Sequence, residues 1–138
     1  KFLQQLYREL LGNAIQSVDE YIEECKNGNR EYKHDELDVY AVKKMLESEN
    51  FRETFKNKSI DKAELESIAK KAVDAFNVYN VNRIVAIASN ESEFRYDGKT
   101  YKVKTIQEEI DFIKSSINKI NKQFGLDWFQ WWQNNFIN

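Results

Sequence analysis

The feature that most constrains the fold is an apolar repeat of three and four residues, which no proline interrupts anywhere in the 138-residue chain. Proline removes a backbone donor and clashes with the preceding helical turn, so helices here end only through glycine, asparagine or a newly capped start. Residues 2–25 show the repeat clearly, with apolar side chains at Leu3, Leu6, Leu10, Ala14, Val18, Ile22 and Cys25. This spacing is typical of one buried helical face, and we predict a long amphipathic helix that stops at residues 26–29.

Two shorter helices are predicted next. After a loop over residues 30–34, a helix is expected to begin near Asp35, whose side chain is suited to accept from the exposed amides of the first turn. Its apolar positions continue to Leu46. Phe51 and Phe55 are four residues apart, which indicates a further short helix.

The clearest helix start is at Asp61. Asp61 and Glu64 have the spacing of a capping box, and Ile60 and Leu65 occupy the flanking apolar staple positions. We expect this helix to end among the asparagines of residues 77–82.

Residues 84–88 form the most concentrated apolar run of the chain. A run this short suits either a buried strand or the core of a short helix, and periodicity does not separate the two. We favour a helix, capped by Asn80 or Asn82. Its shared face would carry Val81, Ile84, Val85 and Ala88.

Asp97 and Gly98 predict a β-hairpin at about residues 92–103. A type I′ turn needs positive φ at both central positions, and an Asp-Gly pair provides it. Pairing outward from the turn places Tyr96 opposite Lys99, Phe94 opposite Tyr101 and Glu93 opposite Lys102. One face then carries Phe94, Tyr96, Tyr101 and Val103. Because an isolated hairpin is marginally stable in water, this aromatic face must lie on the helices.

Two helices are predicted after the hairpin. Thr105 and Glu108 have capping-box spacing and open a helix with an isoleucine every three or four residues, which Gly125 would end. Asp127 can cap a last helix over residues 127–138, which contains all three tryptophans. Together these elements predict a single domain over residues 1–138 that is mainly α (α+β): a compact bundle of five to six helices with one β-hairpin.

Composition narrows the class of protein. The net charge of −2 comes from 21 basic and 23 acidic residues mixed along the chain, so no global field favours polyanions. Cys25 is the only cysteine, which rules out an intramolecular disulfide and fits a reducing, cytoplasmic location. No apolar run approaches the roughly 20 residues that a membrane-spanning helix needs.

No catalytic set is recognised in the sequence. His34 and Cys25 are the only histidine and thiol, and Cys25 falls on the buried face of the first helix, so a structural role is favoured over a Cys/His site. The acids of residues 19–24 are interpreted as a solvated helix face rather than a cation site. We therefore expect no cofactor and no metal.

Two surfaces are candidates for binding. Tryptophan is the residue type richest in interface hot spots, and three within five helical positions span too wide an arc for one buried face. The predicted partner-binding residues are Trp128, Trp131, Trp132 and Phe136. The alternative is a nucleic-acid-binding edge on the hairpin, in which lysines meet phosphates and rings stack on bases. Its residues are Arg95, Lys99, Lys102 and Lys104.

Short segments between residues 30 and 100 occur in an order that resembles one family. They are Arg30-Glu31, the stretch from Ala41-Val42 to Asn50-Phe51, Ile60-Asp61, Arg83-Ile84 and the run Phe94 to Lys99. The family is an uncharacterised domain of unknown function found in large polyvalent proteins of Gram-positive conjugative elements and phages. The chain departs from it at Asp38 and Val39, and after Lys99. The resemblance implies a mobile-element setting and carries no catalytic residue.

The hypothesis from the sequence is a non-enzymatic protein-binding module. The resemblance places its partner in host defence or DNA-transfer machinery, reached through the aromatic C-terminal surface. A nucleic-acid-binding module is the second hypothesis, and an enzyme without a recognisable motif is the third.

Overall fold

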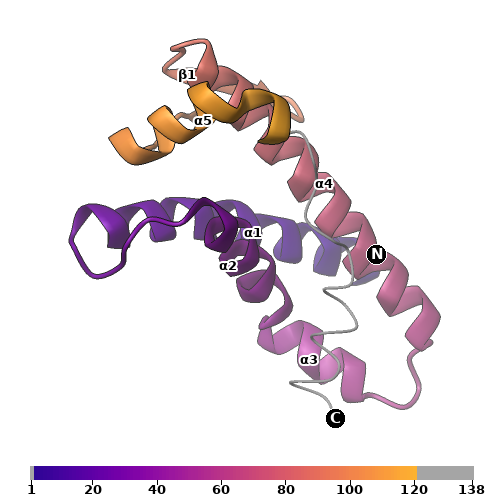
Figure 1. The fold of residues 1–138 in the computed structure, drawn as a ribbon. Coiled ribbons are helices and arrows are strands. Elements are labelled where there is room, and N and C mark those ends of the chain that lie inside the picture. Colours follow the sequence, from indigo (N-terminus) through magenta and orange to yellow (C-terminus); the bar gives the residue numbers. More distant parts are fainter. Residues whose placement is uncertain (1, 121–138) are drawn as a thin grey trace.

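The computed structural model describes residues 2–120, with side chains up to residue 116. In chain order its elements are α1 (Phe2–Lys26), α2 (His34–Leu46), α3 (Glu49–Lys56), α4 (Lys62–Ala88), β1 (Glu93–Tyr96), β2 (Lys99–Lys102) and α5 (Gln107–Ile120). This confirms the prediction of a mainly helical fold with one β-hairpin. Figure 1 shows the long helices α1 and α4 crossing, with the hairpin and α5 at the C-terminal end of α4.

The long helix α1 buries the face that its apolar repeat predicts. Leu6, Leu10 and Val18 are fully buried, and Leu3 and Cys25 at the two ends are half-buried. This face packs against α2 and α4, which makes α1 the centre of the main core. The helix ends at a turn in which Gly28 has a φ of 78°.

The prediction that Asp35 caps α2 is wrong by two positions. The residue preceding the helix is Lys33, in extended conformation and without a side-chain cap. The hydroxyl of Tyr21 accepts from the Lys33 N–H at 3.1 Å and donates to the Lys33 carbonyl at 3.2 Å. This tertiary contact fixes where the loop ends, so the helix starts at His34 without Asp35 as its cap. The predicted short helix is α3, and it buries Phe51 and Phe55.

Helix α4 is one continuous helix of 27 residues. Asp61 caps its start as predicted, although its side chain accepts from the N–H of Ala63 rather than from that of Glu64. The predicted end among residues 77–82 is wrong, because Asn77 and Asn80 are buried inside the helix instead of ending it. The stop comes at Asn90, which has a φ of 60° and follows the last turn as a left-handed C-terminal cap.

Residues 84–88 are helical, as favoured over a strand, but they continue α4 and need no new cap. Ile84 and Ile87 are buried, whereas Val85 is 51% exposed. The predicted shared face was therefore wrong at Val85. The reason is that two cores lie against this part of α4. Ala86 belongs to the main core, and Ile84 and Ile87 contact Ile113 of α5 in a second small core, which leaves the side of Val85 to solvent.

The hairpin forms in the predicted register, with Glu93, Phe94 and Tyr96 opposite Lys102, Tyr101 and Lys99. Asp97 and Gly98 have φ values of 52° and 77°. The aromatic face lies on α4 as expected. The ring of Tyr79 is 5.3 Å from that of Phe94, and the Tyr96 hydroxyl donates to the Ala75 carbonyl at 2.9 Å.

Helix α5 starts later than the sequence indicates. Thr105 does not cap it; its hydroxyl donates to the carboxylate of Glu109 at 2.7 Å, and the helix begins at Gln107. Non-helical backbone at Ser116, with φ −130°, kinks it. The predicted stop at Gly125 and the predicted helix over residues 127–138 lie outside the described residues.

Two glycines provide a matched test of the hairpin. Nothing lies within 4 Å of a Cβ placed on Gly12 or on Gly98, but only Gly98 has positive φ. We expect Gly98→Ala to destabilise the protein by about 1–2 kcal/mol through backbone strain. Gly12→Ala, in the middle of α1, should stabilise it by about 0.5–1 kcal/mol. Urea unfolding of the two variants checks both signs, and a neutral Gly98→Ala would contradict the turn geometry.

Candidate functional site

The described residues contain a polar chain that crosses three helices. We call it the Arg83 cluster and define it as Asp38, Asn80, Arg83, Thr105 and Glu109. At its centre, Arg83 Nη1 of α4 lies 2.8 Å from Glu109 Oε1 of α5, and the two side chains are 2% and 0% exposed. Buried charges at this depth persist only when they are paired. The pair therefore sets how α5 sits on α4.

Hydrogen bonds extend the pair in both directions. Arg83 Nε donates to Asn80 Oδ1 at 3.0 Å, and Asn80 Nδ2 donates to Asp38 Oδ1 of α2 at 2.6 Å. On the other side, Thr105 donates to Glu109 Oε2. The 2.8 Å contact between Arg83 and Glu109 is an ion pair without hydrogen-bond alignment, and Arg83 Nη2 has no hydrogen-bond partner among the residues described.

The cluster holds two acids and one base. Burial raises the pKa of Asp38 to about 6; Arg83 and the Asn80 hydrogen bond oppose this rise, and Glu109 adds to it. Burial alone would lower the pKa of Arg83, but Glu109 outweighs it and raises that pKa above its ordinary value. Arg83 thus stays charged and is paired with Glu109. The surplus negative charge of the cluster lies on Asp38.

Beside the cluster, His34 is held by two aromatic side chains. Its Nδ1 lies 3.0 Å from the Tyr32 hydroxyl, and its ring stacks on Phe112 of α5 with centroids 4.4 Å apart. Burial lowers the pKa of His34, and burial raises that of Cys25. A thiol with a raised pKa is a weak nucleophile. These contacts support the structural interpretation of both residues.

The basic edge of the hairpin is exposed. Arg95 donates to the Thr100 hydroxyl at 3.0 Å and to the Gly98 carbonyl at 3.1 Å, which fixes its guanidinium along the strand. Lys104 lies 3.5 Å from a carboxylate oxygen of Asp19. Lys99 and Lys102 are exposed. The register places Arg95 and Lys102 on one face of the hairpin and Lys99, which pairs with Tyr96, on the other, so the structure does not bring all four cations together. The rings of the hairpin face α4.

The predicted partner-binding residues Trp128, Trp131, Trp132 and Phe136 lie outside the described residues. Within the described part, a different apolar surface emerges on α4. Val78 and Val85 are 54% and 51% exposed, and half-buried Val81 lies between them on the same side of the helix. We call these three residues the α4 valine face. The spacing was visible in the sequence, but two of the three valines were assigned to the core.

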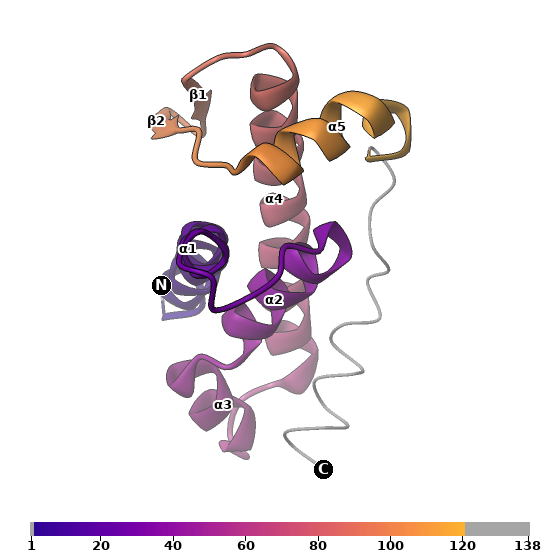
Figure 2. The same cartoon turned by 60° about the vertical axis from the view of Figure 1, so that its left-hand side comes forward.

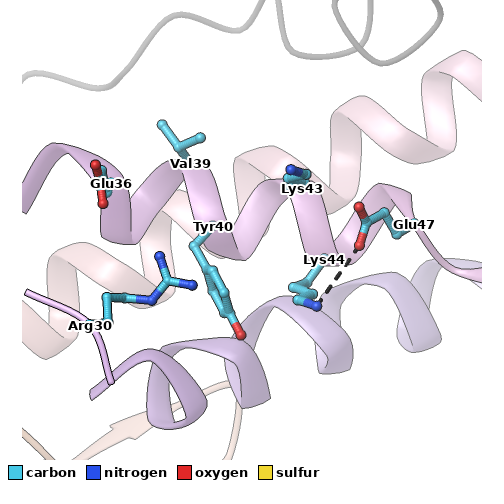
Figure 3. A pocket seen from close by; sticks show the side chains of 7 residues that line it. All are labelled: Arg30, Glu36, Val39, Tyr40, Lys43, Lys44 and Glu47. Atoms are coloured by element: carbon cyan, nitrogen blue, oxygen red, sulfur yellow. Dashed lines mark ion pairs between the residues drawn. The ribbon is translucent and has the colours of Figure 1, made fainter. Parts of the chain in front are cut away.

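A groove of about 480 Å³ runs beside α2 (Figure 3). Its lining residues are Arg30, Glu36, Val39, Tyr40, Lys43, Lys44 and Glu47. Arg30 lies 5.0 Å from the Tyr40 ring centroid and bonds Glu24 at 2.9 Å, while Lys44 lies 4.0 Å from Glu47. The cations are largely matched by acids, so the groove has no marked preference for an anionic ligand.

No protein-family model, curated protein or solved structure matches the chain. The resemblance to the mobile-element domain therefore stays a prediction. Within residues 2–120, no helix has the length and apolar character needed to cross a membrane. Through residue 116, no three histidine, cysteine, aspartate or glutamate side chains are grouped so that they would hold a metal ion.

The ion pair gives a stability prediction. Glu109→Gln keeps the shape of the side chain but leaves Arg83 buried and unpaired, so we expect a loss of about 3–5 kcal/mol in the free energy of unfolding. Exposed Glu108 on the same helical turn is the matched control, and Glu108→Gln should change stability by less than about 0.5 kcal/mol. Urea titrations at neutral pH measure both. Equal effects of the two substitutions would contradict the structural role of the pair.

Proposed function

We propose that the chain is a non-enzymatic protein-binding module that uses apolar helix surfaces. The observation that carries this proposal is the α4 valine face. Two valines that are more than half exposed sit two turns apart on a helix whose other faces are buried in two cores. In Figures 1 and 2, α1 crosses α4, and α1 also packs against α4 in the main core. Valines at i, i+3 and i+7 form the kind of narrow seam that a partner helix packs against.

The polar side chains of the described region support a binding role over catalysis. Arg83 and Glu109 neutralise each other inside the protein, and Asn80 is held between Arg83 and Asp38. His34 is stacked and hydrogen-bonded. These groups are used to join helices rather than to surround a substrate. The tryptophans of the C-terminal segment add a second surface to the proposal, since aromatic residues dominate interface energetics.

The partner that we propose is a protein of host defence or DNA-transfer machinery. This part of the proposal rests on the resemblance to the mobile-element domain, and the near-neutral net charge of −2 is compatible with a protein partner. The partner would present an apolar helix to the α4 valine face.

Capture from a bacterial host lysate tests the proposal. The bait variants are Val78→Lys with Val85→Lys, Trp128→Ala with Trp131→Ala, and a control with Lys70→Ala and Lys71→Ala on the exposed N-terminal half of α4. We expect the wild type and the lysine control to enrich the same protein, identified by mass spectrometry as a defence or transfer component. The valine variant should reduce its recovery at least tenfold, and the tryptophan variant should also reduce it. Retained capture by both, or turnover on a substrate panel, would reject the proposal.

The alternative function is nucleic-acid binding by the hairpin edge. It is favoured by the exposure of the hairpin cations Arg95, Lys99 and Lys102, of which Arg95 and Lys102 share a face. Because the rings of the hairpin face α4, the edge would contact only the phosphates of a nucleic acid. Binding would therefore be weak and independent of the nucleotide sequence.

Electrophoretic mobility of single- and double-stranded DNA tests the alternative. If the edge binds, the affinity should fall steeply between low and physiological salt, and Lys99→Glu with Lys102→Glu should abolish it. Lys56→Glu with Lys58→Glu is the charge-matched control and should leave it unchanged. Absence of a mobility shift at low salt removes this function.

A further inference from the structure

Asp38 joins α2 to the other residues of the Arg83 cluster through the side-chain amide of Asn80, whose orientation is fixed. Asn80 Oδ1 accepts from Arg83 Nε, so its Nδ2 group must point the other way, and it donates to Asp38 at 2.6 Å. The bond therefore connects three helices in series: α2 through Asp38, α4 through Asn80 and Arg83, and α5 through Glu109. Any change in the charge of Asp38 acts where α2 meets the other two.

Within the Arg83 cluster, the two carboxylates Asp38 and Glu109 face a single cation, which leaves one negative charge in excess. Arg83 of α4 is the facing cation, and it is already in contact with Glu109 of α5. Asp35, on α2 itself, adds a further negative charge. His34 lies one turn earlier on α2, and the phenol of Tyr32 is bonded to it. A proton on Asp38 would remove the excess without breaking the chain, because a neutral carboxyl group still accepts from Asn80.

Asp38 is less enclosed than the ion pair at the centre of the cluster. The residue is half-buried, whereas Arg83 and Glu109 are fully buried. Protonation at Asp38 therefore requires no opening of the ion pair.

We propose that Asp38 is a proton-operated latch, in which uptake of one proton below neutral pH tightens α2 against α4 and α5. The latch is a regulatory element of the fold, separate from the partner-binding surfaces proposed above. It makes the α2 contact strongest in a mildly acidic environment.

The direction follows from linkage. The Asp38 pKa is raised by burial from 3.8 to about 6 in the folded protein, so the folded state takes up the proton first as the pH falls. Stability from this group is therefore gained as the pH falls through about 6, and the folding constant should rise about tenfold between pH ~7.5 and pH ~5. His34 acts in the opposite direction, because burial lowers its pKa and the unfolded chain takes up that proton first.

The experiment separates the two groups. The parent protein carries His34→Gln, which removes the opposing titration of His34. Urea unfolding is measured across this pH range for the parent and for two double variants, which add Asp38→Asn or Asp35→Asn to it. We expect the folding constant of the parent and of the exposed Asp35→Asn control to rise about tenfold on acidification. Asp38→Asn, which resembles the protonated acid, should remove this rise and be the more stable form at pH ~7.5. An unchanged rise with Asp38→Asn would overturn the latch.

A second measurement covers the case in which His34→Gln does not fold. The carboxyl carbon of Asp38, followed by NMR in the wild-type protein, should titrate with a midpoint near pH 6. The amide protons of Leu37 and Ala41 in α2 should shift with the same midpoint in the wild type, and not in Asp38→Asn. Titration of Asp38 below about pH 4.5, in the ordinary range of an aspartate, would overturn the proposal.

Discussion

The ion pair between Arg83 and Glu109 is the interaction on which the rest of the arrangement depends. Both side chains are removed from water, and each would be strongly destabilising without the other. Because the two residues come from α4 and α5, the pair specifies the register of α5 more narrowly than the small apolar contact of Ile113 with Ile84 and Ile87 does. Asn80 extends this specification to α2, so one polar chain orders three helices that the apolar core alone would position less exactly.

The contacts of the Arg83 cluster support a structural role for the polar residues of this region. A buried arginine, two acids and a histidine near one another resemble a catalytic site in composition. Here Glu109 is held by Arg83 and Thr105, and His34 by Tyr32 and Phe112. On the surface of the described residues, the α4 valine face and the basic hairpin edge both suit binding. The surplus negative charge at Asp38 adds a response to pH that neither surface requires.

The sequence predicted the elements whose signals are local. The register of the hairpin follows from Asp97 and Gly98, because positive φ at two positions is a property of the turn itself. The start of α4 follows from Asp61, whose side chain reaches an amide two residues away. Continuation of α4 through Asn80 was not predictable, because the Asn80 side chain is hydrogen-bonded to Asp38 of α2, which only the tertiary structure brings close. Asn77 is also buried inside the helix, and its side-chain oxygen has no hydrogen-bond partner among the residues described. Similarly, Thr105 is suited to cap α5, but its hydroxyl instead donates a hydrogen bond to the carboxylate of Glu109.

By itself, then, the sequence determined the helical class, the buried face of α1 and the hairpin with its aromatic side, since these depend on periodicity and turn chemistry within a few residues. Only the tertiary structure decided that Glu109 and Arg83 are buried, that Val85 faces solvent and that Asp38 meets Asn80. Each of these depends on groups that are far apart in the chain: Asp38 and Asn80 are 42 residues apart. From the local sequence alone, a charged residue is predicted to be exposed. Its burial becomes stable only when the fold brings a partner from another helix.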